Sequence, residues 1–233
     1  MMRFEEWEPV YEAILADFGY DRAADERARN MLVDLLDGPG YDETTLAFGD
    51  ATVAIAGGAD RLLDELELAR EADAVVAASV AAERLREHGV AVDCMVTDLD
   101  KVPGTAHRLT EAGTPVAVHA HGDNIPALRE VVPDLRTAAV IPTTQARPIG
   151  PVRNYGGFTD GDRAAFLADA LGAGRLLFPG WNFDDPSVGP EKRRKLAWAE
   201  RLLYWLERRR DEQFAVLDGR REALAVPDGV DGR

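Results

Sequence analysis

Three short acidic turns follow apolar segments of this chain, and their residue types suit a site that holds a metal ion and phosphate groups. They lie at residues 96–100, 119–124 and 157–163. Carboxylates are ligands that Mg²⁺ prefers, and a bound Mg²⁺ usually joins one or two of them to substrate phosphates. The carboxyl ends of parallel strands lie at one edge of a sheet, so carboxylates that are distant in the sequence meet there. The pattern therefore predicts a metal and nucleotide site.

Asp98 and Asp100 end the first of these segments, with Leu99 between them. In extended geometry residues two apart point the same way, so we expect both carboxylates to hold a divalent cation. The alternative interpretation is a solvated loop that caps the next helix. Asp123 has the same two interpretations, as a third metal ligand and as a helix N-cap.

His119 and His121 alternate with small apolar residues, and we expect them to share one face of their strand. We favour hydrogen bonds from these rings to backbone or phosphate, and we group them with Asn124 as nucleotide-binding candidates. Ligation of zinc by the two histidines is the alternative, because two imidazoles this close suit that metal.

The third turn combines a helix cap with further charged groups. Thr159 and Asp162 fit a variant of the capping box, which explains the turn structurally. The cap leaves Asp160 and Arg163 unexplained, and a guanidinium beside two acids is suited to orient a carboxylate or bind phosphate. We therefore treat Asp160, Asp162 and Arg163 as catalytic candidates, with the two acids as metal ligands or as the group that accepts a substrate proton.

Two weaker patterns and a basic cluster complete the candidate site. Gly57 and Gly58 close an apolar run as a phosphate-binding turn would, although close backbone packing explains them equally well. Lys195 belongs to the basic cluster at 192–195, which is either a solvated face or a contact for polyphosphate. A further segment consists of Trp181, Asn182 and Phe183. Its aromatic side chains would suit contact with a flat heterocycle as readily as packing in the core.

The elements that would position these residues alternate between apolar runs and amphipathic stretches. This alternation predicts βα units and an α/β fold with a mainly parallel, Rossmann-like sheet flanked by helices. Strands are expected at 51–56, 73–79, 92–99, 115–121, 137–142 and 175–179. Helices are expected at 59–71, 80–88, 104–112, 124–131, 160–171 and 190–209.

The two ends of the chain differ from this alternation. Residues 4–37 carry apolar side chains at helical spacing, which predicts two helices. Short apolar runs at 214–217 and 223–226 predict a terminal hairpin. We expect an N-terminal helical segment packed on the main domain, a catalytic α/β domain and a frayed tail. Their bounds are 1–40, 41–226 and 227–233.

Composition narrows the class of protein and its partners. The chain has 233 residues, of which 46% are apolar, enough for one α/β domain with its own core. A formal charge of −15 argues against nucleic acid or an anionic membrane as a partner, because both are bound mainly by clustered Lys and Arg. The acid excess favours a halophilic source, where salt screens self-repulsion.

The lone Cys94 cannot form an internal disulfide, which fits a reducing compartment. The first residues lack the basic and apolar pattern of a signal peptide, and no segment approaches the roughly 18 apolar residues of a membrane helix. We therefore expect a cytoplasmic protein, and the sequence leaves its oligomeric state open.

In combination and order, these motifs resemble those of the archaeal 6-hydroxymethyl-7,8-dihydropterin pyrophosphokinases, which are distantly similar to the catalytic domain of thiamin pyrophosphokinase. The match begins with the helical pair around Trp7, runs through 97–100, 119–124 and 156–163, and ends at Lys195-Leu196. The resemblance implies transfer of diphosphate from ATP to the pterin hydroxymethyl group, with release of AMP and a requirement for Mg²⁺. It implies ATP and a reduced pterin as partners.

The chain departs from the family pattern at two points. Lys101 stands where the family usually has Gly, and residues 56–60 replace a Gly-x-Gly-Pro-Ser-like turn. Three alternatives stay open: a diphosphokinase for another acceptor such as thiamin, a zinc-dependent hydrolase and a non-catalytic nucleotide-binding module. The hydrolase would use His119, His121 and Asp123. The absence of histidines after residue 121 weighs against it.

Overall fold

A computed structural model describes residues 2–46 and 48–227 of the chain. Six parallel strands form one sheet in the order β5-β4-β3-β2-β1-β6. All six lie where the apolar runs predict them, and the sheet is wholly parallel rather than mainly so. Their bounds are Thr52–Ala56 for β1, Ala74–Ala78 for β2, Cys94–Thr97 for β3, Val116–Ala120 for β4, Val140–Thr144 for β5 and Arg175–Leu177 for β6.

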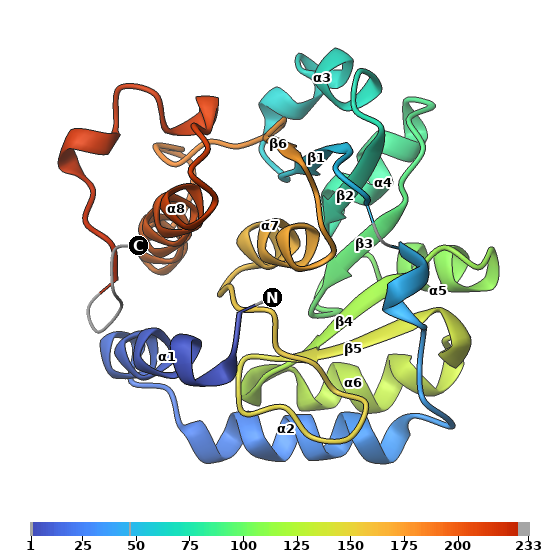
Figure 1. The fold of residues 1–233 in the computed structure, drawn as a ribbon. Helices are drawn as coiled ribbons and strands as arrows, with labels where there is room; N and C mark the ends of the chain where they lie inside the picture. The colour runs from blue at the N-terminus through green and yellow to red at the C-terminus, as the bar shows by residue number, and fades with distance from the viewer. Residues whose placement is uncertain (1, 47, 228–233) are drawn as a thin grey trace.

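Helices cover both faces of the sheet, which explains why most strands are buried along nearly their whole length. One face is covered by α3 (Leu66–Arg70), α4 (Val80–Glu87), α5 (Pro103–Glu111) and α6 (Ile125–Val131). The other is covered by α7 (Asp160–Ala170), with α8 (Pro190–Arg210) outside it (Figure 1). Within the described parts of the chain, no helix combines the length and the apolar character needed to cross a membrane.

The order of the strands creates a switch point between β1 and β6. From β1 to β5 each strand adds beside the one before it, whereas β6 returns to the far side of β1. The return passes through α7, which packs across β1, β2 and β3. Ligand cavities in open α/β sheets form outside the carboxyl ends of the strands at such reversals.

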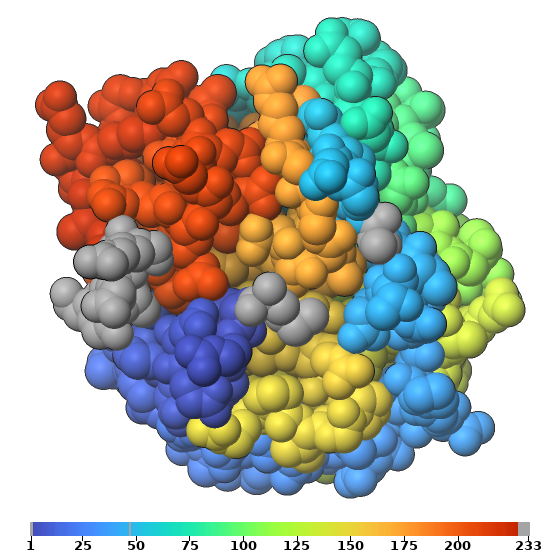
Figure 2. Space-filling view, in the orientation of Figure 1, coloured from blue at the N-terminus to red at the C-terminus, as the bar shows by residue number. Residues whose placement is uncertain are grey.

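Two helices precede the sheet, as the apolar spacing predicts: α1 (Phe4–Phe18) and α2 (Arg22–Leu35). They serve different cores. Trp7 of α1 is buried among residues of α7 and α8, whereas Ala28 and Leu32 of α2 join the core on the opposite face of the sheet. Figure 2 shows the N-terminal segment lodged between the C-terminal part of the chain and the segment that follows β5.

The predicted terminal hairpin is wrong. The first run forms a 3₁₀ turn at Ala215–Leu217, the second follows a 3₁₀ turn at Arg221–Ala223 as irregular chain, and no strand lies in either. The segment docks on α8 instead, because Arg221 donates to Glu207 at 2.8 Å and the apolar side chains of the first run are buried. Of the tail predicted to fray, residues 228–233 lie outside the described part of the chain.

Candidate active site

Two adjacent cavities lie at the carboxyl edge of the sheet. Cavity 1 has a volume of about 330 Å³ and cavity 2 one of about 220 Å³. Residues that line both cavities form what we call the shared wall. They are Lys101, Thr159, Asp160 and Lys192. The two cavities therefore meet along one charged partition.

Most of the charged candidates line cavity 1, and the glycine turn lines cavity 2. Beside the shared wall, the predicted residues in cavity 1 are Asp98, Asp100, His121, Asp123, Arg163 and Lys195. Those in cavity 2 are Gly57, Gly58, Trp181 and Asn182. Four candidates line neither cavity, namely His119, Asn124, Asp162 and Phe183. The structure thus brings the three acidic turns together, but not every residue within them.

The first turn is a tight bend rather than the extended segment that we predict from the sequence. Leu99 is buried and has a left-handed backbone with φ of 66°. The Leu99 N–H donates to Oγ1 of Thr97 at 2.9 Å, and the Asp100 N–H donates to Oδ1 of Asp98 at 3.2 Å. These bonds hold a conformation that is unfavourable for a branched residue. Both carboxyls reach cavity 1 through the bend.

The pKa values of Asp98 and Asp100 are shifted in opposite directions. Burial alone would raise the pKa of Asp98, but hydrogen bonds from His121 and Asp100 and the charge of Arg163 lower it below its usual range. Burial, and then the hydrogen bond and charge of Asp98, raise the pKa of Asp100 to about 6. Below that pH the pair shares one proton. Above it, two carboxylates face one another in a cavity, which is the charge pattern of a cation site.

The second turn brings His121 and Asp123 to cavity 1. Nε2 of His121 lies 3.4 Å from Oδ2 of Asp98. Asn124 does not reach the cavity; its amide donates to the backbone oxygens of Asp98 and His119, each at 2.7 Å, and its Oδ1 accepts from the His121 N–H. Asn124 therefore joins the first turn to the second instead of facing a ligand.

His119 lies behind the cavity and does not complete a zinc site. Its side chain is buried and its Nδ1 lies 3.1 Å from Oγ1 of Thr143. Burial and the charge of Arg163 lower the pKa of His119 well below its ordinary value. Within residues 2–46 and 48–227, no three His, Cys, Asp or Glu side chains gather closely enough to hold a metal ion by themselves. The structure therefore lends no support to a hydrolase built on His119, His121 and Asp123.

The third turn separates its two acids. Asp162 is buried and accepts hydrogen bonds from the backbone N–H groups of Phe158 and Thr159, so it is the N3 member of the capping box of α7, whose N-cap is Thr159. Asp160 faces the shared wall and accepts from Nη1 of Arg163 at 3.2 Å. Burial, with the charge of Asp98, raises the pKa of Asp160 to about 7. Burial also raises the pKa of Asp162, but the cap occupies its carboxyl, so Asp160 alone of the two has both the position and the proton affinity of an acid–base group.

The glycine turn of cavity 2 lies at the switch point of the sheet. Gly57 follows β1, and its N–H donates to the Pro179 oxygen at 2.9 Å. A Cβ at Gly57 would stand 2.5 Å from the backbone oxygen of Gly180, so only glycine lets the two loops approach. Close packing thus explains Gly57 fully, and the same packing forms part of the cavity 2 wall.

Ser79, which the sequence analysis missed, is the strained residue of cavity 2. Ser79 follows β2 and is the N-cap of α4, with φ of 45° and ψ of −116°, a conformation that favours glycine. Ser79 is 7% exposed, and its hydroxyl has no hydrogen-bond partner among the described residues. Strain of this kind concentrates at functional sites, and a buried free hydroxyl at a helix N-terminus suits a phosphate or ribose oxygen.

The residues of the aromatic segment after β6 do not all line cavity 2. Trp181 lines cavity 2, and its Nε1 donates to the Ile55 oxygen at 2.8 Å, which fixes the indole at the end of β1. Asn182 lines the same cavity. Phe183 packs against Trp181, with ring centroids 5.7 Å apart, and faces a separate surface groove. The glycine turn and two of the heterocycle candidates, Trp181 and Asn182, therefore share one cavity.

The basic cluster contributes Lys192 more directly than Lys195. Nζ of Lys195 pairs with Glu191 at 3.0 Å and lies over the ring of Tyr20. Lys192 belongs to the shared wall, as does Lys101, the residue at which the chain departs from the family pattern. These two ammonium groups flank the partition beside Asp160 and are suited to bind phosphate oxygens.

Cavity 1 also has lining residues that sequence reasoning missed. Tyr20, Asp25 and Gln145 come from the N-terminal pair and from the segment after β5. One signal was available for Asp25: it shares helical spacing with Ala28 and Leu32, so an acid lies on the buried stripe of α2. Gln145 lies just beyond β5, which extends two residues past the predicted end at residue 142.

A parallel α/β sheet with one cavity at its switch point and a second, lined by paired acids, beyond the ends of β3 and β4 defines a Rossmann-like enzyme whose acids and lysines suit phosphate-bearing substrates. Residues 31–187 match the family described as 6-hydroxymethylpterin diphosphokinase MptE-like. The chain belongs to this family and is an enzyme of the diphosphotransferase class.

Relatives named 6-hydroxymethyl-7,8-dihydropterin pyrophosphokinase match the chain over most of its length. The protein from Methanothermobacter thermautotrophicus is 40% identical over 90% of this chain and 97% of its own. That from Pyrococcus furiosus is 36% identical over 88% of this chain and 95% of its own. The protein from Methanocaldococcus jannaschii is 28% identical over 91% of this chain and 99% of its own. The family resemblance predicted from the acidic turns is therefore confirmed.

Proposed function

We propose that the protein transfers diphosphate from ATP to the hydroxymethyl group of 6-hydroxymethyl-7,8-dihydropterin, releasing AMP. The names of its relatives support the acceptor. The observation that carries the proposal is the pair of cavities divided by the shared wall, with carboxylates on one side and a glycine turn on the other. Two substrates that react at one phosphorus atom need such an arrangement.

The adenosine and α-phosphate of the donor bind in cavity 2 in this proposal. The Ser79 hydroxyl and the N-terminus of α4 suit the α-phosphate, and Gly57 and Gly58 shape the cavity wall by packing closely against Gly180 and Val80. Trp181 and Asn182, which were predicted for the acceptor, then serve the donor heterocycle instead. The acceptor pterin binds in cavity 1, beside Tyr20.

Asp98 and Asp100 fit a magnesium ion. Asp123 lines the same cavity from the neighbouring turn and would reach the ion through a water molecule, because the three carboxylates do not gather into one ligand set among the described residues. The fit rests on the bend at Leu99, which brings both carboxyls to cavity 1. Burial first, and then the hydrogen bond and charge of Asp98, raise the pKa of Asp100, and a bound cation would favour its ionised form. Protein sites of this kind need only one or two carboxylates, because phosphate oxygens and water complete the coordination. When bound, Mg²⁺ neutralises charge on the phosphates and orients them.

The protein's own side chains supply the rest of the chemistry. Lys101 and Lys192 bind the phosphate oxygens along the shared wall, and Arg163 orients Asp160. The acceptor oxygen forms a bond to the β-phosphorus while the bond from that phosphorus to the α,β-bridging oxygen breaks, and AMP leaves. The hydroxyl proton passes to Asp160, whose pKa of about 7 matches the task.

The decisive experiment incubates the protein with ATP, MgCl₂ and the reduced pterin in high salt, and separates the nucleotides and pterins by chromatography. We expect AMP and pterin diphosphate in equal amounts. Formation of ADP, or no turnover, would overturn the proposal. Thiamin, tested in parallel, is the competing acceptor, and its preferential use would reassign cavity 1. We propose ATP and the pterin as the partners of this protein. We propose no nucleic-acid or membrane partner, and we place the reaction in the cytoplasm.

A further inference from the structure

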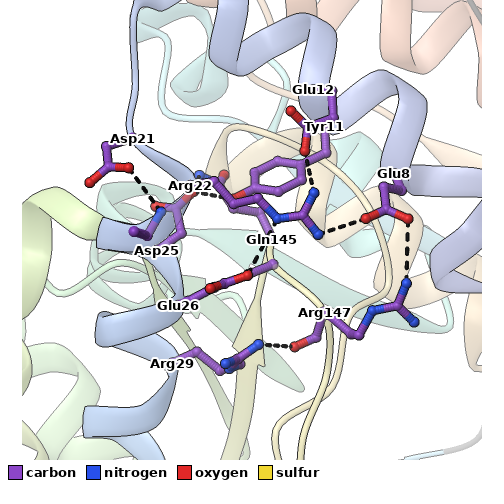
Figure 3. A network of polar contacts seen from close by, with 12 residues as sticks. Glu8, Tyr11, Glu12, Asp21, Arg22, Asp25, Glu26, Arg29, Gln145 and Arg147 are labelled. Carbon is purple, nitrogen blue, oxygen red and sulfur yellow. Dashed lines mark hydrogen bonds and ion pairs between the residues drawn. The ribbon is translucent and has the colours of Figure 1, made fainter.

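Asp25 is a buried carboxylate at which three other segments of the chain meet (Figure 3). It lies in the first turn of α2, on the wall of cavity 1, and is 3% exposed. Its oxygens accept hydrogen bonds from Oη of Tyr11 at 2.8 Å, from the Gly122 N–H at 2.7 Å and from Nε2 of Gln145 at 2.7 Å. A carboxylate buried this deeply is costly unless donors surround it. These donors come from α1, from the turn after β4 and from the segment after β5.

The contact with Gly122 fixes the second acidic turn. Gly122 lies between His121 and Asp123, and a Cβ at Gly122 would stand 2.6 Å from the Cβ of Ala24. Helix α2 therefore packs directly against the backbone of the turn, and the Asp25 carboxylate holds the Gly122 N–H at the same place. The two side chains that this turn presents to cavity 1 take their positions from α2.

The contact with Gln145 decides which way its amide faces. Because Nε2 donates to Asp25, Oε1 points toward Arg163 and accepts from Nη2 at 3.4 Å. Nη1 of Arg163 in turn donates to Oδ1 of Asp160 at 3.2 Å. A reversed amide would set its NH₂ group against the guanidinium, where neither side can accept a hydrogen bond. Asp25 thus holds Arg163 in place through Gln145.

We propose that Asp25 is a positioning residue for the transfer reaction, acting through the turn at Gly122 and through Gln145 and Arg163 on the shared wall. It does not bind the ligand itself, because both of its oxygens already accept hydrogen bonds and it is nearly inaccessible. The N-terminal helical pair thereby takes part in the reaction instead of only covering the core. This role rests on the proposed function.

The substitution Asp25→Asn separates positioning from general stability. The amide keeps an oxygen for the Gly122 N–H, and Tyr11 can turn its hydroxyl to accept from the new NH₂ group. Two NH₂ groups would then face one another, so the Gln145 amide must reverse to accept from the new amide, and its own NH₂ group then faces the Arg163 guanidinium. Adding Gln145→Glu places acceptors opposite both the new amide and Arg163. The double variant therefore rebuilds the chain of hydrogen bonds from residue 25 through residue 145 to Arg163, with the carboxylate at residue 145 instead of residue 25. Tyr11→Phe is the matched control, because it removes one of the three donors without touching this path.

We expect Asp25→Asn to lower kcat between about tenfold and a hundredfold, with the KM for ATP changed by less than about threefold, because the reacting groups are misplaced rather than removed. The double variant should recover most of the lost kcat. Tyr11→Phe should keep kcat within about twofold of wild type while its unfolding midpoint falls as much as that of Asp25→Asn. A crystal structure of Asp25→Asn should show the Gln145 amide reversed and Arg163 displaced from Asp160.

Three results would overturn the inference: a kcat of Asp25→Asn close to wild type, a double variant no better than the single one, or an equal loss of kcat in Tyr11→Phe. Unchanged positions of Gln145 and Arg163 in the variant crystal would do the same. If the wild-type protein transfers no diphosphate, the proposed function fails by itself, and the crystal structures still test whether Asp25 holds the path in place.

Discussion

Nε2 of His121 lies 3.4 Å from Oδ2 of Asp98 and joins the turn after β4 to the turn after β3. Nδ1 of the same ring accepts from the Asp123 N–H, so the proton lies on Nε2 and the ring donates to Asp98. This bond favours the ionised form of Asp98. Asp98 is therefore a carboxylate that stays charged, and its neighbour Asp100 takes up a proton as the pH falls below about 6.

We expect Asp98→Asn and Asp100→Asn each to lower kcat/KM at least about a hundredfold, because each removes a carboxylate that would hold the cation against the phosphates. Steady-state formation of AMP at saturating Mg²⁺ measures the effect. Asp134→Asn is a suitable control, since Asp134 is an exposed acid on a 3₁₀ turn that lines neither cavity. Wild-type rates in both cavity variants would remove these residues from the site.

Asp100→Asn should also stabilise the metal-free protein at pH 8. The pKa of Asp100 is about 6 in the folded state against an ordinary 3.8, so the ionised group destabilises the folded protein above pH 6. That destabilisation disappears as the pH falls from 6 toward 3.8, because the folded state then binds a proton that the unfolded state does not. Thermal unfolding of both proteins at pH 8 and pH 4.5, without metal, measures the difference. A lower midpoint for the variant at pH 8 would contradict the account.

Magnesium should bind more weakly at pH 5.5 than at pH 8, and its binding should release protons at the lower pH. The cation and the proton compete for Asp100, whose pKa is about 6. Calorimetric titration of Mg²⁺ in two buffers of different ionisation enthalpy counts the protons, and chelation with EDTA should abolish turnover at either pH. An affinity that does not change between these pH values would exclude Asp100 as a ligand.

Lys192→Ala should impair the enzyme more than Lys195→Ala. Lys192 lines both cavities, whereas the ammonium of Lys195 is paired with Glu191 at 3.0 Å. We expect kcat/KM for ATP to fall at least about tenfold in the first variant and less than about threefold in the second, as for a charge that contacts phosphate and one that does not. The two substitutions remove the same charge from the same helix, so each is the control for the other. Equal losses would argue for a general effect of helix charge.

Ser79→Gly and Ser79→Ala should separate the hydroxyl from the strain. Both remove the oxygen and should raise the KM for ATP to a similar extent. At φ of 45° and ψ of −116° only glycine is unstrained, so Ser79→Gly should be more stable than Ser79→Ala by about 1 kcal/mol. Denaturant unfolding and initial rates give the two quantities. A wild-type KM in both variants would show that the hydroxyl does not contact the nucleotide.

The sheet could be predicted almost completely, because strands buried on both faces appear in the sequence as continuous apolar runs. The run at 92–99 gave β3, and the amphipathic stretch at 104–112 gave α5 within a residue at each end. The C-terminal hairpin failed for a physical reason. Apolar runs of four residues fit a docked loop as well as a strand, and the ion pair between Arg221 and Glu207 that decides the matter is long-range.

The site could be predicted by residue type but not by orientation. The acids of the turns were visible, yet which of them face the cavity depends on local geometry: the left-handed Leu99 brings Asp100 inward, and the cap of α7 turns Asp162 away. The positions of Asp25 and Ser79 depend on how helices pack against strand ends. Helical spacing marks Asp25 as an acid on the buried stripe of α2, but not what it contacts, and no local spacing marks Ser79. The position of His119 behind the cavity could not be predicted, because a buried imidazole and a ligand-binding one have the same sequence pattern.

The return of the chain from β5 to β6 has a consequence for folding. The steps from β1 to β5 join neighbours, whereas α7 and β6 close a connection that passes over several strands. Contacts between distant parts of a chain form late, because the loop that they close must first be ordered. We therefore expect a kinetic intermediate with five strands assembled and neither cavity yet complete, detectable as late protection of α7 amides in pulsed hydrogen exchange. Catalytic competence would then be the last property that this chain acquires.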